Sequence, residues 1–326
     1  MIRKIILSTY LLTLITITGY SQKDVIDFLN FGLDDAGKLS EAYLNPYGEM
    51  LGVNLNSGWY TAASVHKLGG FDLTFSASYT TVPTSGKTFD VNKLGLTEWS
   101  LLDANNHIAP TMAGKMNESD IPQLVEDNTG ITLPVPNGTG SNFMVSQMIQ
   151  AGVGLPYHTE IVGRFMPKVS YGNLGNLQLW GVGIKHSVKD YIPVFKRLPV
   201  LQLSVLGAYT NFTGALRLGS IEDMVENTEL NIKSNAYTGR LLLGANIPVF
   251  AFYTGIGYGN ATSTFDINGR LVGEENSANL INMKFKTSGF DFNAGMRVRL
   301  GIIGIHADYS VGEYAVITGG IGISFR

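Results

Sequence analysis

The sequence of 326 residues contains no cysteine. Neither a disulfide framework nor a lipid-anchored cysteine can therefore be built from it. The same absence removes thiolate metal sites and thiol nucleophiles from the possible chemistry, although it says nothing about the redox compartment.

Long hydrophobic runs are also missing after the first 21 residues. A membrane-spanning helix needs about 18 or more apolar residues, and no later stretch approaches this length. The composition, with 44% hydrophobic residues and 39 glycines, fits one large soluble domain or one barrel. A chain that enters a bilayer without such helices must close into a barrel, because backbone groups in lipid have to pair internally.

An excess of basic residues is lacking as well, since the net charge is -3. This gives no electrostatic case for a nucleic-acid partner. The charged residues that are present at the start have a different meaning. Arg3 and Lys4 precede an apolar stretch from 5 to 17, and the small residues Gly19 and Ser21 follow. We predict a signal peptide over residues 1–21, cleaved before Gln22 after export across the inner membrane.

Alternation of apolar and polar residues recurs through the rest of the chain, and period two places successive side chains on opposite faces of a strand. In 71–80 and 290–300 one face is apolar and the other carries polar or charged residues. The sequence therefore predicts an all-β fold, a transmembrane antiparallel β-barrel; the short N-terminal helical hatch that completes the expected fold is implied only by the family resemblance given below. Further runs of this kind lie near 51–60, 147–155, 159–171, 176–187, 199–212, 234–247, 249–264, 303–311 and 317–325.

The last two runs alternate in the same way, and the sequence ends one residue after Phe325. This pattern is typical of the closing strands of a barrel in the bacterial outer membrane, with membrane lipid as its surroundings. Amphipathic aromatic residues are expected at the two membrane interfaces. The candidates for these girdles are Trp59, Tyr79, Trp180, Tyr209, Tyr258 and Tyr309.

The strand number follows from parity, because bacterial single-chain barrels have an even number, short periplasmic turns and long outer loops. Turns at 156–158, 248 and 301 then lie in the periplasm, and 214–233 and 266–282 lie outside. One further strand near 86–98 gives about twelve strands, whereas three strands in 83–145 would give about fourteen. We favour twelve.

Two segments do not follow the alternation. Residues 99–145 contain four prolines and the run 137–142, Asn-Gly-Thr-Gly-Ser-Asn, and predict a long extracellular loop. Residues 189–199 are basic and aromatic, and we interpret them as an interfacial turn on the periplasmic side.

The start of the mature chain carries a family resemblance. A segment that looks helical, 24–33, leads into Asp35-Ala36 and then Asn45-Pro46, with Tyr47 and Gly48 after it. This resembles the hatch of the FadL-like outer-membrane long-chain fatty-acid transporter superfamily, in which an acidic-Ala segment precedes an Asn-Pro turn before the first strand. The family's usual Asn-Pro-Ala-Gly is not kept. The resemblance implies a hatch over 22–48 and a barrel over 49–326.

The resemblance also implies a function. A hatch blocks the lumen, and a lateral opening in the wall gives an apolar ligand a route that avoids water. A break in the strand ladder needs glycine, proline or a bulge, and Gly163–Pro167 and Gly255–Gly259 are the candidates. Ordinary barrel curvature is the alternative explanation for these residues.

Charged residues on the lumen faces allow two interpretations. Buried charges in a barrel are commonly paired, which would make them a structural network. Alternatively, arginines clamp a carboxylate or another anionic head group bidentately. The ligand-binding candidates are Arg240, Arg297, Arg299, Asp291, His306 and Asp308.

Catalysis, metal binding and a cofactor are not expected. His306 and Asp308 share a face, but such neighbours lie about 7 Å apart, and no two histidines have ligand spacing. The sequence favours a transporter or channel for small hydrophobic or amphipathic molecules. The alternatives are a scaffold or receptor that acts through its long loop and, behind both, an outer-membrane hydrolase.

Overall fold

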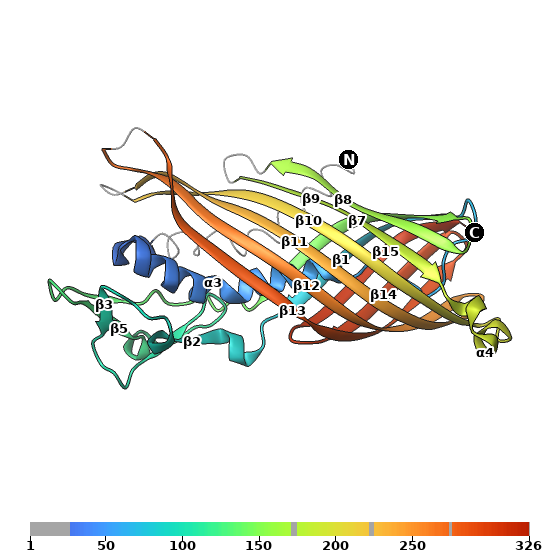
Figure 1. The fold of residues 1–326 in the computed structure, drawn as a ribbon, viewed down its shortest axis with the longest axis horizontal. Coiled ribbons are helices and arrows are strands. Elements are labelled where there is room, and N and C mark those ends of the chain that lie inside the picture. Colours follow the sequence, from blue (N-terminus) through green and yellow to red (C-terminus); the bar gives the residue numbers. More distant parts are fainter. Residues whose placement is uncertain (1–26, 171–174, 222–224, 274–275, 326) are drawn as a thin grey trace.

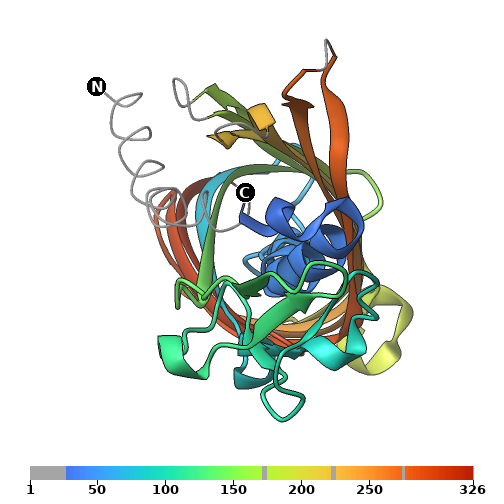
Figure 2. The same cartoon turned by 90° about the vertical axis from the view of Figure 1, so that its left-hand side faces the viewer.

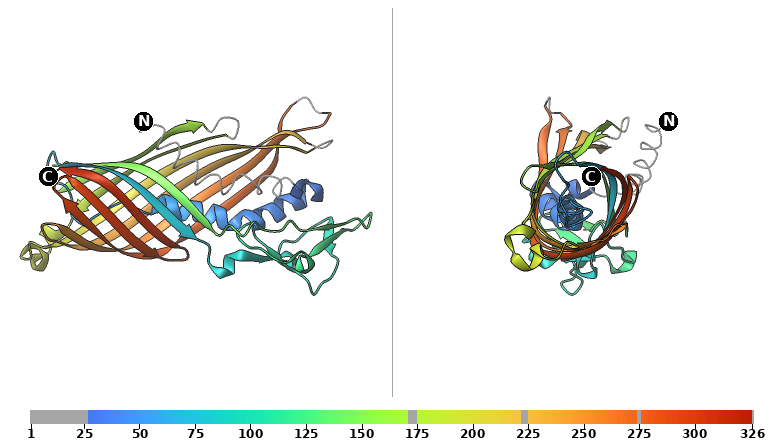
Figure 3. Two further views of the ribbon diagram at one scale, coloured as in Figure 1. Left: turned by 180° about the vertical axis from the view of Figure 1, so that it is seen from behind. Right: turned by 90° about the vertical axis from the view of Figure 1, so that its right-hand side faces the viewer.

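The computed structural model describes residues 27–170, 175–221, 225–273 and 276–325. The predicted signal peptide, 1–21, lies outside them. Antiparallel strands close into a ring in the order β1-β15-β14-β13-β12-β11-β10-β9-β8-β7, and β7 pairs with β1 to complete it (Figure 1). Figure 3 shows the ring end-on. The barrel strands are β1 (Phe71–Thr81), β7 (Phe143–Leu155), β8 (Thr159–Ser170), β9 (Gly175–Ser187), β10 (Leu201–Ile221), β11 (Val225–Asn246), β12 (Phe250–Leu271), β13 (Ala278–Leu300), β14 (Ile303–Val311) and β15 (Ala315–Phe325).

The outer surface of the ring carries an apolar belt. Ile184, Ile256 and Ile305 face outward and are each more than half exposed. This apolar surface on a closed antiparallel wall confirms the predicted transmembrane β-barrel. Aromatic side chains mark one edge of the belt, where Trp180 contacts Tyr209 and Tyr209 contacts Tyr237. Tyr79, Tyr258 and Tyr309 are also exposed, but Trp59 is 1% exposed inside the lumen, so its assignment to a girdle was wrong.

The predicted count of about twelve strands was also wrong, because the described ring has ten. The run 51–60 is not a strand, since the helix α3 (Leu33–Asn56) occupies most of it. Its apolar residues fit helical spacing as well as alternation. The run 86–98 contains only short elements, η2 (Thr84–Lys87), β2 (Thr88–Asp90) and η3 (Val91–Lys93). The number of strands is still even, because two of the twelve predicted strands, 51–60 and 86–98, are missing from the ring.

The wall is uneven in height. Strands β10 to β13 have 21 to 23 residues, whereas β14 has 9. The β13–β14 register covers only Phe292–Leu300, so Ala278–Asp291 rises beyond it. Segments 214–233 and 266–282, which we expected as outer loops, are mostly strand in this extension. Alternation continues there with a polar outer face, as at Asn231 and Lys233.

The short connections share one end of the barrel, as predicted. The turns at 156–158, 247–249 and 301–302 lie at the same end as the C-terminus, together with η5 (Lys189–Tyr191) and α4 (Pro193–Lys196) (Figure 1). We call this the short-turn end and the opposite one the long-loop end. None of the described helices is long and apolar enough to span a membrane.

A folded cap, residues 82–142, connects β1 to β7 at the long-loop end (Figure 2). The predicted extracellular loop 99–145 is thus part of this cap, which begins earlier in the chain and contains short strands and helices. The cap packs against α3 around one apolar cluster that includes Trp99, Ala109 and Leu124. Its remaining elements are β3 (Trp99–Leu101), β4 (Ile108–Pro110), η4 (Glu118–Asp120), β5 (Gln123–Glu126) and β6 (Thr132–Pro134), with β2 pairing β4 and β5 lying between β3 and β6.

The N-terminal segment fills the lumen (Figures 1 and 3). It comprises η1 (Phe28–Phe31), α3 and an irregular chain that leads to β1, and we call residues 28–70 the plug. The predicted hatch ended at 48 and the barrel began at 49, but α3 continues to Asn56 and the first barrel strand begins at Phe71. The helix extends through Pro46, which is buried.

Two glycines of α3 offer a test of how tightly the helix is packed. A Cβ on Gly48 would lie 2.2 Å from Cγ of Phe285 in β13, whereas a Cβ on Gly37 would meet nothing within 4 Å. We expect Gly48→Ala to lower the free energy of unfolding by about 1–3 kcal/mol through overpacking. Gly37→Ala should raise it by up to about 1 kcal/mol through helix propensity. Urea unfolding in detergent measures both, and equal effects would contradict this packing.

Candidate functional site

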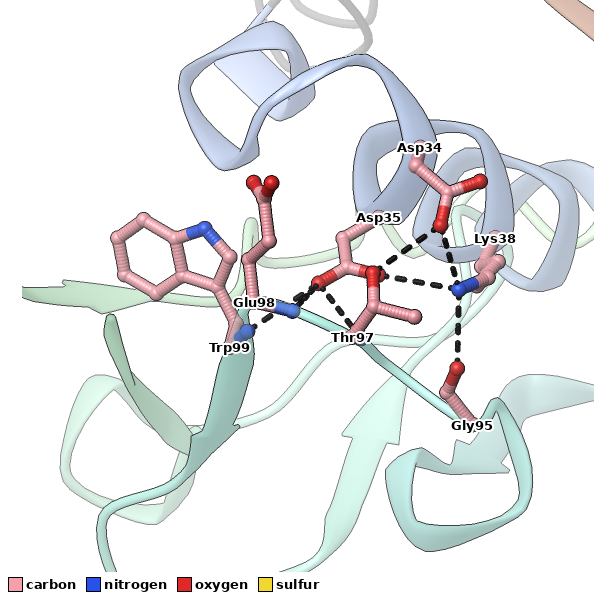
Figure 4. Close-up of polar contacts among 7 residues, drawn as sticks. All are labelled: Asp34, Asp35, Lys38, Gly95, Thr97, Glu98 and Trp99. Carbon is pink, nitrogen blue, oxygen red and sulfur yellow. Dashed lines mark hydrogen bonds and ion pairs between the residues drawn. The ribbon is translucent and has the colours of Figure 1, made fainter. Parts of the chain in front are cut away.

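The N-terminal end of α3 is fastened to the cap by a buried carboxylate (Figure 4). Asp35 is 1% exposed and accepts hydrogen bonds from the backbone N–H groups of Thr97 (2.9 Å), Glu98 (2.9 Å) and Trp99 (3.2 Å). Lys38 Nζ lies 3.2 Å from Asp35 and donates to the carbonyl of Gly95 at 2.9 Å. We call this set the latch.

The latch is stable in the ionised form of Asp35. Burial alone would raise the pKa of this carboxyl, but the backbone N–H groups of Glu98 and Thr97 and the Lys38 ammonium outweigh it and hold the pKa below its ordinary value. Three converging backbone donors are a strong arrangement for an anion. The predicted hatch residue Asp35 therefore holds the plug to the cap, and the adjacent Ala36 is fully buried in the core.

The other predicted hatch pair does not form a turn. Asn45 and Pro46 lie inside α3, with Asn45 half-buried on the helix surface and Pro46 buried. The Asn-Pro turn implied by the FadL-like resemblance is therefore wrong for this chain. A proline removes one helical hydrogen bond, but packing on both sides keeps the helix continuous here.

The middle of α3 closes the outer half of the lumen. Gly48 and Gly52 face the wall, where a Cβ on Gly52 would lie 2.7 Å from Ala261 Cβ in β12. Around them Met50, Phe265 and Phe285 are buried, and the two phenylalanine rings are 4.8 Å apart. These side chains belong to one buried apolar cluster, which packs the helix closely against the wall.

The C-terminal end of α3 rests on an arginine of the wall. Arg164 of β8 donates to the backbone carbonyls of Leu55 and Ser57 and to Gln150 Oε1 at 3.0 Å. Its guanidinium also stacks on Trp59, 3.8 Å from the ring centroid. A cation at this position complements the negative end of the helix. The sequence could not reveal this contact, because the two segments are far apart in the chain.

The charged candidates of the lumen fall into separate groups. Arg240 and Asp291 form a bidentate ion pair with both N···O distances at 2.7 Å. Tyr253 donates to Asp308 at 3.3 Å, and His306 lies 3.4 Å from the hydroxyl of Ser76. These contacts support the structural interpretation for four of the six candidates. Among the described residues, His306 and Asp308 thus bond different partners, and not each other as a catalytic dyad would.

The two remaining candidates, Arg297 and Arg299, line a chamber at the short-turn end. This chamber has a volume of about 1090 Å³ and lies at the barrel mouth, between the irregular part of the plug, residues 59–68, and the surrounding wall. The same chamber wall includes His66 and Asp72, which lie close to Glu160 and Lys185. The sequence did not predict this cluster, because its members come from four separate segments that only barrel closure brings together.

The cluster brings one histidine and two carboxylates within 4.8 Å of one another, a geometry that could hold a metal ion. However, Glu160 is already satisfied by protein donors. Lys185 Nζ lies 3.0 Å from Oε1, and the backbone N and Nδ1 of His66 lie 2.8 and 2.9 Å from Oε2. The neighbouring ammonium also opposes a second cation. We therefore interpret the cluster as an ion network.

The wall diverges between β7 and β8. Their register runs from Leu155↔Thr159 to Ile149↔Phe165 and ends there. Beyond this point β7 continues along β1 to Phe143, and β8 continues along β9 to Ser170. Figures 1 and 2 show β8 and β9 leaning away from the ring. We call the divergence of 143–148 from 166–170 the seam.

The seam coincides with one of the predicted ladder breaks, Gly163–Pro167. A register irregularity lies between Met166 and Val169, and Pro167 has no N–H to donate to a ladder. The other candidate, Gly255–Gly259, pairs in continuous register with β11 and β13 and is ordinary wall.

Together, the closed strand ring with its apolar belt and the internal helix define a transmembrane β-barrel protein with an N-terminal plug. The family described as "Family of unknown function (DUF6588)" matches residues 1–325, and the chain belongs to it. No curated protein matches the sequence.

The solved structures that match this chain have low sequence identity and low TM-scores. The translocator domain of the autotransporter NalP from Neisseria meningitidis is 10% identical, with 80% of this chain and 89% of that chain covered and a TM-score of 0.36. Ail from Yersinia pestis is 8% identical, with coverages of 79% and 98% and a TM-score of 0.28. The toluene transporter TbuX from Ralstonia pickettii is 7% identical, with coverages of 83% and 92% and a TM-score of 0.26. The FadL-like resemblance stays a prediction.

The latch predicts a pH-dependent loss of stability. Asp35→Ala leaves three backbone N–H groups without their acceptor and should lower the free energy of unfolding by about 3 kcal/mol or more at neutral pH. Because the pKa of Asp35 is depressed in the folded state, its contribution is complete above the unfolded value near 3.9 and is lost as pH falls below it. Urea unfolding of both proteins between neutral and acidic pH measures the difference.

The neighbouring Asp34 provides the control. It is exposed and bonds Lys38 and the Thr97 hydroxyl but accepts from none of the three backbone N–H groups. Asp34→Ala should therefore have a smaller effect than Asp35→Ala. A difference between wild type and Asp35→Ala that persists unchanged into acid would contradict the ionised latch.

Proposed function

We propose that this protein is an outer-membrane transporter for small hydrophobic or amphipathic molecules, which pass between its lumen and the bilayer through the seam. The observation that carries the proposal is the end of the β7–β8 ladder at Ile149↔Phe165. An interruption of pairing in lipid is costly unless other groups satisfy the backbone, so a break within the apolar belt is a feature to explain.

The seam begins inside the belt. Tyr79, an exposed aromatic residue at the belt edge, pairs with Val145 of β7. The β7–β8 ladder ends at Ile149, and Val145 lies four residues from Ile149 toward the long-loop end. This separation corresponds to roughly 13 Å along the strand. With short turns in the periplasm and long loops outside, the seam lies in the outer leaflet.

The inner side of the diverging strands is apolar. Met166 of β8 and Leu179 of β9 are buried, and Leu177 and Phe212 pack beside them. These side chains belong to the same cluster as Leu44 and Leu55 of α3. An apolar solute that enters through the seam would therefore meet an apolar surface next to the plug. Passage onward to the chamber at the short-turn end requires displacement of the plug.

Displacement of the plug can be tested with an engineered disulfide. A Cβ on Gly259 would lie 3.5 Å from Asn56 Cβ, within the range of natural disulfides, and the chain has no native cysteine. We expect oxidised Asn56→Cys/Gly259→Cys to reduce uptake of radiolabelled laurate and toluene to the level of cells without the protein. Reduction of the bond should restore uptake. Full uptake by the oxidised protein would exclude a moving plug, and the single cysteine variants are the controls.

The seam itself can be tested with a polar substitution. Leu179→Gln places an amide on the inner face beside the seam, and Leu230→Gln makes the same change on β11, at similar burial but away from it. Both should lower the free energy of unfolding by about 1–3 kcal/mol. Only Leu179→Gln should slow uptake of the apolar probes, and an equal effect on uptake would contradict the lateral route.

A second candidate function is a receptor or scaffold that acts through the cap. The observation that favours it is the folded cap itself, in which the apolar side chains of Leu102 and Ile131 are 56% and 57% exposed. This proposal predicts that deletion of cap residues 103–106 leaves uptake unchanged but abolishes adhesion or partner binding by cells that carry the protein.

A further inference from the structure

The chamber at the short-turn end carries an excess of positive charge. Among the residues that the structure describes, four basic side chains line it and two carboxylates, Asp72 and Glu160, accompany them. With His66 neutral, the lining has two uncompensated positive charges. The basic side chains are Lys67, Lys185, Arg297 and Arg299.

The carboxylates are engaged on one side of the chamber. Glu160 pairs with Lys185 and His66, and Asp72 lies 3.9 Å from His66 Nδ1. Among the described residues, neither Arg297 nor Arg299 has a carboxylate within ion-pair distance. The excess charge therefore lies on these two arginines and on Lys67 at the mouth.

Arg297 also has an unused donor. Its Nη1 donates to Thr61 Oγ1 at 3.3 Å, but its Nε is buried and has no hydrogen-bond partner among the described residues. Buried donors of a charged group are almost always paired, so Arg297 has hydrogen-bonding capacity that the described residues leave unfilled.

The other lumen arginines show that such pairing is the rule in this barrel. Arg240 has both carboxylate oxygens of Asp291, and Arg164 has two backbone carbonyls, Gln150 and the Trp59 ring. Among the described inward-facing arginines, those without a carboxylate or backbone partner are thus Arg297 and Arg299 of the chamber.

Arg297 and Arg299 occupy successive inward positions of β13, about 7 Å apart along the strand. Their cross-strand partners are His306 and Gly304, and the glycine leaves space beside Arg297, whose Cδ would lie 3.7 Å from a Cβ there. Two long guanidinium side chains at this spacing can converge on one anion and bind it through several charge-assisted hydrogen bonds.

We propose that the chamber is an oxyanion-binding site in which Arg297 and Arg299 hold a carboxylate, sulfate or phosphate group. This inference deepens the proposed function and rests on it for the remainder of the ligand, since an amphipathic acid would place its head group here. A free inorganic anion has the same chemistry. The sequence grouped Arg240 with these arginines, but Arg240 is not part of the proposed site because its guanidinium already pairs with Asp291.

Equilibrium dialysis of the purified full chain in a non-ionic detergent tests the site, with radiolabelled sulfate and octanoate as the probes. We expect saturable binding to the wild type and at least a roughly tenfold weaker affinity in Arg297→Gln/Arg299→Gln, the loss of about one charge-assisted hydrogen bond. The matched control is Lys284→Gln/Lys286→Gln, which removes the same charge from exposed outer positions of β13. Its affinity should equal that of the wild type.

The outcomes separate the sources of the anion. Binding of both probes supports a general oxyanion site, and binding of octanoate alone supports an amphipathic acid. Binding of neither probe, or equal weakening in the lysine control, overturns the proposal. Should the double variant fail to fold, Arg299→Gln alone must weaken binding. The two proposals can fail separately. If sulfate still binds but the oxidised Asn56→Cys/Gly259→Cys protein transports normally, the moving plug is overturned and the anion site is retained.

Discussion

Backbone pairing in lipid is the constraint on which the rest of this structure depends. Every strand of the belt has two neighbours, and β1 completes the ring by pairing with both β15 and β7. Closure fixes which side chains face inward, because the period of two leaves no other choice once the apolar face meets lipid. The lumen, the position of the plug and the chamber all follow from that assignment. It also makes the seam conspicuous as the place where pairing between neighbours stops early.

The plug divides the lumen into two regions with different physics. At the long-loop end, α3, the cap and the tall part of the wall share an apolar core. At the short-turn end, the wall is lined by charges and hydroxyl groups around an open chamber. The two regions meet at Arg164, which binds the last carbonyls of the helix and stacks on Trp59. A movement of the plug would therefore have to unpack a core at one end and release an arginine at the other.

Several features could be predicted from the sequence, and the errors have physical causes. Alternation located all ten barrel strands, because a strand with one face in lipid must keep its period. It failed at 51–60, where apolar residues of a buried helix imitate alternation, and at 86–98, where only short cap elements form. Gly163–Pro167 was correctly singled out as a ladder break, since a missing N–H is a local property. The Asn45-Pro46 turn was wrong because packing around Pro46 keeps α3 continuous.

The sequence by itself determined the class of fold and the faces of the strands, because these depend on local periodicity, and a family resemblance pointed to an N-terminal segment in the lumen. Only the tertiary structure decided which charges are paired. Arg240, Arg297 and Arg299 all lie on the inward face of their strands. Arg240 nevertheless pairs with Asp291, whereas the other two line the chamber. Strand register and barrel closure set those neighbours through backbone hydrogen bonds between distant segments, and no local pattern records them.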